Sequence, residues 1–238
     1  MFDNLLDNKQ HDANARTMSG DFFVSVYTYM FVALLISGTI AYACGTPEFI
    51  VRYFITATGL SPLFYVVVFA PVGLGLLIQM GYNRLSMGVL YLLFGAYAAL
   101  MGLSLSTIFV IYDIGSIFST FFVTAGAFAA MAILGYTTKT DLTKMGSLLY
   151  MVFIGIFIAG IVNIFMKSEM MGFVISLVGV FVFTGLTAYH MQNLKHISQD
   201  PALSGLDKRK LSLIGGLQLY ILFINLFLSL LRLMGGRD

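Results

Sequence analysis

Charged residues are scarce in this 238-residue chain, where Asp, Glu, Lys and Arg together make up only 10%. A soluble domain has about 25% charged residues, so most of this surface is not expected to face water. The net charge of +2 is too small for the basic patch of a nucleic-acid-binding protein, and we expect no nucleic acid among its partners. A single cysteine, Cys44, excludes an intramolecular disulfide and a cysteine-cluster metal site.

Ionisable groups are missing from the centre of every long apolar run. Such groups inside a membrane usually mark ion pathways and proton relays. Zinc-ligand spacings of the type His-Glu-x-x-His and paired carboxylates, both typical of hydrolases, are absent as well. We therefore expect no enzyme activity, no cofactor and no resident metal. Residues 1–21 contain four aspartates and no basic n-region, so no cleavable signal peptide is expected.

Long apolar segments fill most of the chain, and each is long enough to cross a hydrocarbon core about 30 Å thick. Alternating barrel strands are absent, so each segment is predicted to be a helix. The sequence thus predicts an all-α membrane protein with a cytosolic N-terminal tail (1–22), a single transmembrane domain (23–234) and a C-terminal tail (235–238). The seven predicted helices are 23–44, 61–80, 87–110, 115–135, 146–166, 171–192 and 212–234.

The distribution of Lys and Arg predicts the orientation of the chain in the membrane. Nine of these residues fall on one side of the predicted helices and four on the other. By the positive-inside rule, the N-terminus is cytosolic and the C-terminus outside. A re-entrant last helix would instead leave both termini in the cytosol. The nine are Lys9, Arg16, Arg84, Lys139, Lys144, Lys195, Lys208, Arg209 and Lys210, and the four are Arg52, Lys167, Arg232 and Arg237.

The last predicted helix carries the most polar face in the membrane. Its stripe positions recur at spacings of four, three, four and three residues, which place them on one helical face. Amides exposed to hydrocarbon are unfavourable, so this helix is predicted to be central, surrounded by the other six. Its amides either form hydrogen bonds between helices or line a pore, and both readings stay open. The stripe consists of Gln218, Leu222, Asn225, Ser229 and Arg232.

Two further residues are candidates for a functional role. His190 ends the sixth predicted helix near the cytosol and could sense pH, because histidine titrates near neutrality; it could equally be a polar end-group. Arg84, in the short turn between the second and third helices, is either a consequence of the positive-inside bias or a latch against the last two helices. The basic run Lys208–Lys210 predicts contact with anionic membrane lipids.

Several ordered segments resemble the Bax inhibitor-1 family of membrane proteins, from about Ala98 onward. In the last helix, the family usually has Tyr-Leu-Asp-Phe-Ile-Asn where this chain has Tyr220 to Asn225. The resemblance implies six helices around the seventh, in a bacterial inner membrane or a eukaryotic internal membrane. It also implies a pH-sensitive calcium leak or a modulator of stress responses. The other resembling segments are 101–106, 120–126, 135–146, 161–163 and 183–189.

This chain departs from the family at the positions that would carry negative charge. The resemblance places a pair of aspartates at His190 and Leu222, and some members have an acidic residue in the second helix, where 61–80 has none. Two carboxylates can share a proton near neutral pH, but a histidine facing a leucine cannot. Two hypotheses follow: an ion (calcium) leak with His190 as pH sensor and Gln218 and Asn225 lining the path, or a non-transporting protein that binds a partner such as a membrane protease.

Overall fold

The computed structural model describes residues 2–57 and 59–235, with the side chains of 19–57 and 59–235, and it is almost entirely helical. The predicted tail 1–22 and the charges of Lys9, Arg16 and Arg237 lie largely or wholly outside the described side chains. The elements are α1 (Phe2–Cys44), α2 (Pro47–Phe54), β1 (Ile55–Thr56), β2 (Gly59–Leu60), α3 (Pro62–Gly81), α4 (Met87–Leu105), α5 (Ile108–Ile111), α6 (Ile114–Thr137), α7 (Thr143–Met166), α8 (Glu169–Gln199) and α9 (Gly205–Met234).

The prediction of seven membrane helices is confirmed. Within the described part of the chain, seven helical segments are long and apolar enough to span a bilayer, and each coincides with a predicted one. Side-chain caps explain where most of them begin. A Ser, Thr or Asp oxygen accepts a hydrogen bond from a backbone N–H of the first turn, as helix N-termini favour. These N-caps are Ser61, Ser86, Asp113, Ser168 and Ser204, and Thr46 caps the short helix α2 in the same way.

The third predicted helix, 87–110, is not one uninterrupted helix. It divides into α4 and α5 around Ser106 and Thr107. Both hydroxyls donate to carbonyls three residues earlier, Ser106 Oγ to Leu103 at 2.6 Å and Thr107 Oγ1 to Ser104 at 3.0 Å. Such local bonds compete with the helical backbone ladder. The whole stretch Met87–Ile111 still serves as one membrane span.

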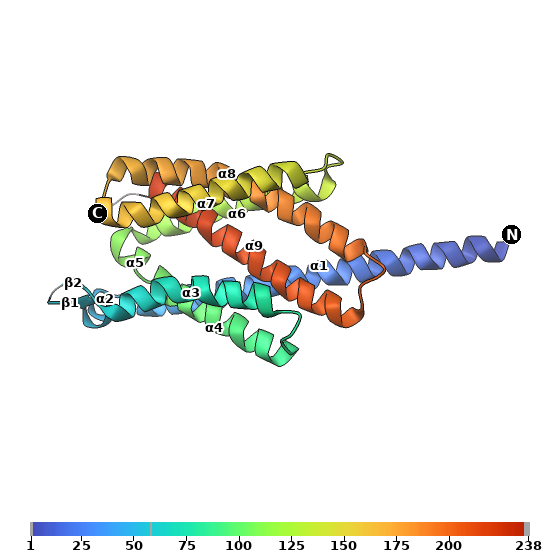
Figure 1. Ribbon diagram of the computed structural model, residues 1–238, viewed down its shortest axis with the longest axis horizontal. Helices are drawn as coiled ribbons and strands as arrows, with labels where there is room; N and C mark the ends of the chain where they lie inside the picture. The colour runs from blue at the N-terminus through green and yellow to red at the C-terminus, as the bar shows by residue number, and fades with distance from the viewer. Residues whose placement is uncertain (1, 58, 236–238) are drawn as a thin grey trace.

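Helix α9 lies at the centre of the bundle, as predicted. In its most apolar 18-residue stretch, 72% of the residues are buried, compared with 39% in α8 and none in α7. Figure 1 shows α9 running diagonally between one group formed by α6, α7 and α8 and another formed by α1, α3 and α4. Its closest neighbours are α8, α1 and α6. The start of α1 and the end of α9 lie at opposite ends of the bundle (Figure 1), as an odd number of crossings requires.

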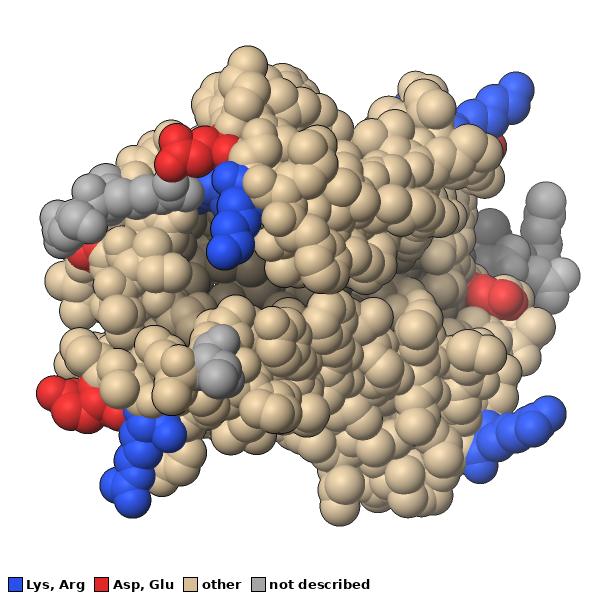
Figure 2. Space-filling model, turned by 60° about the vertical axis from the view of Figure 1, so that its left-hand side comes forward, with Lys and Arg blue, Asp and Glu red and all other residues tan. Residues whose placement is uncertain are grey.

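Charged side chains are confined to the ends of the molecule. Figure 2 shows Lys, Arg, Asp and Glu near the ends and a broad uncharged band between them. The turns that carry Arg84, Lys139 and the basic run of α9 lie at one end, whereas α2 and the α7–α8 turn lie at the other (Figure 1). The predicted division of basic residues between two sides therefore corresponds to two ends of the bundle. The face in Figure 2 is hollowed between its two lobes.

Glycines allow the closest contacts between helices. A Cβ added at Gly135 of α6 would lie 2.6 Å from the Cα of Ala188 on α8. A Cβ at Gly216 of α9 would lie 2.8 Å from the carbonyl oxygen of Val26 on α1. Backbone atoms cannot move aside as side chains do, so neither position accepts a side chain in this packing. These contacts hold α6 against α8 and α9 against α1.

We expect Gly135→Ala to destabilise the bundle by about 1–3 kcal/mol, because the added methyl overlaps the α8 backbone. Gly126→Ala in the same helix is the matched control, since a Cβ there meets nothing within 4 Å. The control should be neutral or slightly stabilising, as alanine favours helix. The midpoint of thermal unfolding in detergent measures both. Equal shifts for the two variants would contradict the proposed packing.

Candidate functional site

The polar stripe of α9 faces the space between α3, α7 and α8, where two pockets open along it. Gln218 lines one pocket, and Asn225, Ser229 and Arg232 line the other. Leu222 lines neither, and only 6% of its surface is exposed. The stripe is therefore divided into two polar parts by one buried leucine.

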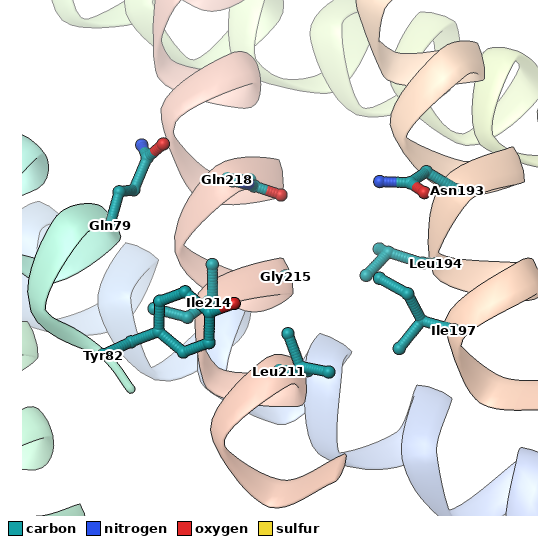
Figure 3. Close-up of a pocket in the computed structure, with 9 residues that line it drawn as sticks. All are labelled: Gln79, Tyr82, Asn193, Leu194, Ile197, Leu211, Ile214, Gly215 and Gln218. Carbon is teal, nitrogen blue, oxygen red and sulfur yellow. The ribbon is translucent and has the colours of Figure 1, made fainter. Parts of the chain in front are cut away.

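The first pocket has a volume of about 180 Å³ and lies toward the start of α9, between α3 and α8. In Figure 3, the Gln218 and Asn193 side chains extend toward one another across it, and Gln79 and Tyr82 border it from α3 and the turn that follows. The amides of Gln79 and Asn193 have no hydrogen bond to a described residue, so they are free to bind water or a solute, whereas the Gln218 side chain meets the imidazole of His190 on α8. The remaining lining residues are Leu194, Ile197, Leu211, Ile214 and Gly215.

The second pocket, of about 300 Å³, lies toward the C-terminal end of α9 and is mostly apolar. Its polar residues are Ser176 of α8 and the last three positions of the stripe. Its apolar lining comes from all four surrounding helices: Val68, Phe69, Val72, Phe153, Ile156, Phe157, Gly160, Ile161, Ile164, Ile175, Phe183 and Leu228.

Leu222 occupies the interval between the two pockets. A helix rises about 1.5 Å per residue, so Gln218 and Asn225 are separated by about 10 Å along α9. Polar side chains of the stripe cannot bridge that distance while Leu222 lies between them. In this conformation Leu222 separates the two pockets along the stripe.

The polar groups near the C-terminal end of the stripe bond within their own helix. Asn225 Nδ2 donates to the Ile221 carbonyl at 2.8 Å, and Ser229 Oγ donates to the Asn225 carbonyl at 2.8 Å. Neither makes a hydrogen bond to another helix among the described residues. For Asn225 this geometry agrees with lining a pocket, whereas for Gln218, which meets His190 of α8, both readings stay open.

His190 is buried beside the stripe and has a partner on α7. Only 5% of its surface is exposed, and its Nε2 lies 2.6 Å from the hydroxyl of Tyr150. Its Nδ1 is buried and has no hydrogen bond to a described residue, although the Gln218 amide lies close to the ring. The Tyr189 ring packs edge-on against the imidazole with centroids 5.4 Å apart. His190 is thus neither exposed to lipid nor a solvated end-group.

Lys210, rather than Arg84, links the turn after α3 to α9. The Arg84 guanidinium is exposed and makes no hydrogen bond or ion pair with a described residue. Instead Lys210, from the basic run of α9, donates from Nζ to the Asn83 carbonyl at 3.3 Å. The turn between α3 and α4 is therefore linked to α9, but by the lysine rather than by Arg84.

Gln192 is a structural anchor that the sequence reading missed. Its Oε1 accepts from the Leu142 N–H and its Nε2 donates to the Thr140 carbonyl, both at 2.8 Å. One buried side chain thus fixes the loop between α6 and α7 onto α8. The only local signal was an amide two residues after His190, and its partners are 50 and 52 residues away in sequence.

No metal centre is formed by the residues described. Among them, no three His, Cys, Asp or Glu side chains lie close enough together to hold an ion. Both pockets also lack a carboxylate. An ion in the stripe would meet only amides, hydroxyls and one arginine.

Comparison with known proteins identifies the family. The family profile described as "Inhibitor of apoptosis-promoting Bax1" matches residues 20–238. The chain belongs to the Bax inhibitor-1 family. It is 40% identical over 218 residues to "Inner membrane protein YbhL" of Escherichia coli K12, covering 91% of this chain and 92% of that protein.

Two other bacterial relatives match over a similar length. An "Uncharacterized protein" of Borreliella burgdorferi is 43% identical over 220 residues, which cover 91% of this chain and 92% of the relative. "Uncharacterized protein RP147" of Rickettsia prowazekii is 39% identical over 232 residues, or 97% and 94% of the two chains. With its seven apolar helices, this member of the Bax inhibitor-1 family is an integral membrane protein.

We expect Tyr150→Phe to destabilise this Bax inhibitor-1 family member by about 1–3 kcal/mol, because it leaves a buried imidazole nitrogen without its partner. Tyr91→Phe is the control, since its hydroxyl pairs with that of Tyr29 at 3.0 Å on the exposed surface. That variant should change the stability by less than about 0.5 kcal/mol. Thermal unfolding in detergent compares the two variants. A larger loss of stability for Tyr91→Phe would contradict the assignment of Tyr150 as the buried partner of His190.

Proposed function

We propose that the protein is an ion leak pathway that follows the polar face of α9 and is closed at Leu222, with calcium as the first ion to test. The observation that carries the proposal is the division of one polar stripe into two pockets by a single buried leucine. We place the protein in a bacterial inner membrane, as the name of the Escherichia coli relative says of that protein.

The gate differs in chemistry from a pair of carboxylates. Leu222 cannot be opened by titration, so opening requires its side chain, or α9 itself, to move. Calcium prefers several oxygen ligands, and the two pockets supply amide and hydroxyl oxygens without a carboxylate. In a leak of this kind, ions would keep their hydration shell as they pass, because no carboxylate in the pockets binds them directly.

Protonation of His190 is the proposed link to pH. A charged imidazole has two N–H donors, and Tyr150 faces only Nε2. The second donor would need an acceptor, and the nearest amide is that of Gln218, which lines the first pocket. The positive charge of the protonated His190 would also repel an entering cation. The tyrosines Tyr150 and Tyr189 are the other titratable groups that face the ring.

We expect Leu222→Asn to raise calcium flux into proteoliposomes about tenfold. The change keeps the side-chain size and adds a hydrogen-bonding group worth about 1–3 kcal/mol to a passing hydrated ion, and 1.4 kcal/mol corresponds to about tenfold. Leu226→Asn is the matched control, because it adds the same amide four residues later, outside both pockets. If both variants leak equally, the flux reflects a loosened bundle and the pathway is wrong.

We expect the flux of Leu222→Asn to be lower at pH 4 than at pH 8. His190 is only 5% exposed, so its imidazole gains a proton only in acid, and the charged ring then repels cations. Adding His190→Gln, which keeps hydrogen bonding and removes titration, should make the two rates equal. Flux measured at both pH values in the single and double variants decides this. A difference that persists in the double variant would exclude His190 as the sensor.

The second candidate is a non-transporting protein that binds a partner such as a membrane protease. The buried and uncharged Leu222 between the two pockets favours this non-transporting role. If neither the wild type nor Leu222→Asn conducts, this reading replaces the leak, and crosslinking in native membranes should then retain a membrane partner.

A further inference from the structure

The second pocket has the character of a hydrocarbon-binding trough. Four phenylalanines contribute to its wall, namely Phe69, Phe153, Phe157 and Phe183. Along α7 the lining extends from Phe153 to Ile164, which is about 16 Å at 1.5 Å per residue. The volume of about 300 Å³ suits a single chain better than a protein helix, which is about 10 Å across.

Most polar donors in this trough are already used. Ser176 Oγ donates to the Gly172 carbonyl at 2.9 Å, and the Asn225 amide and Ser229 hydroxyl donate to carbonyls of α9. An apolar ligand could therefore lie against them without breaking a hydrogen bond. Unpaired buried donors would have made such a ligand unfavourable.

Arg232 places a positive charge at one end of this apolar trough. Its side chain is exposed, lies in the last turn of α9 and lines the pocket. Its guanidinium makes no hydrogen bond or ion pair with a described residue. A guanidinium binds phosphate with two parallel hydrogen bonds, and phosphates are abundant where a membrane helix reaches the bilayer surface.

An apolar trough that ends at an unpaired arginine matches an amphiphile with an anionic head. We infer that the second pocket binds one anionic phospholipid of the surrounding bilayer, with its phosphate on Arg232 and one acyl chain along α7. The inference stands on the pocket and the arginine and does not depend on ion flux. A chain in this position would also cover Asn225 and Ser229 and so fill the C-terminal half of the stripe.

The first test fills the trough with a side chain. Gly160 lines the pocket, and a Cβ there meets nothing within 4 Å, so Gly160→Leu should fold and occupy the space of the lipid chain. Gly155→Leu on the same helix is the matched control, because it has the same free space but lies outside the pocket. Native mass spectrometry of protein released from nanodiscs of equal phosphatidylglycerol and phosphatidylcholine counts the lipids retained.

We expect the wild type and Gly155→Leu to retain one phosphatidylglycerol and Gly160→Leu to lose it. Thermal unfolding in detergent confirms that both variants are folded. Equal retention by all three proteins would mean that the lipid is bound elsewhere on the surface, and the inference would be overturned.

The second test removes the charge. Arg232→Gln should reduce the preference for phosphatidylglycerol over phosphatidylcholine about fivefold, because one basic group near the membrane surface contributes about 1 kcal/mol. Arg52→Gln, at the same end of the bundle (Figure 1) but outside the pocket, should leave the preference unchanged. An unchanged preference in Arg232→Gln, or equal losses in both variants, would exclude Arg232 as the phosphate site. Because the readout is bound lipid, a protein that conducts no ion can still pass both tests.

Discussion

Hydrocarbon offers no hydrogen-bonding partner to an amide, and this constraint decides where α9 lies. With Gln218 and Asn225 on one face, the helix is stable in a bilayer only when protein or water covers that face. The bundle meets the requirement by packing α9 against α1, α6 and α8. Gly216 brings α1 close enough to seal the opposite face of α9. The polar face is left toward the looser space between α3, α7 and α8, where both pockets form.

The same constraint explains how the chain accommodates the residues at the two positions where the resemblance implies aspartates. A leucine at 222 needs no partner and closes the gap between the pockets by packing alone. A histidine at 190 does need one, and Tyr150 supplies it from α7. A charge carried by His190 would therefore be positive, whereas the carboxylate pair that the resemblance implies would be negative. A carboxylate pair attracts a cation when it loses its proton, whereas an imidazole repels one when it gains a proton.

The helices and the central place of α9 could be predicted from the sequence, because run length and helical periodicity are local properties. The interruption at Ser106 was missed, since a hydroxyl that bonds backward looks the same in sequence as one that does not. The pairing of Tyr150 with His190, and that of Gln192 with the loop after α6, join residues 40 to 52 positions apart. Nothing local distinguishes Lys210 from Arg84 as the residue that reaches the turn after α3. These contacts depend on which helices become neighbours.

The two pockets differ enough in chemistry to suit different occupants. Around the first, the unpaired amides of Gln79 and Asn193 favour water, whereas phenylalanines and internally bonded donors in the second favour hydrocarbon. Removing an ion from water still costs several kcal/mol after the protein relaxes, and about 10 Å of α9 between Gln218 and Asn225 offers no polar side chain on the stripe to offset that cost. Water entering the second pocket would shorten this dry interval, and an acyl chain there would lengthen it. In the leak that we propose, the occupant of the second pocket would therefore set the barrier at Leu222 together with the charge on His190.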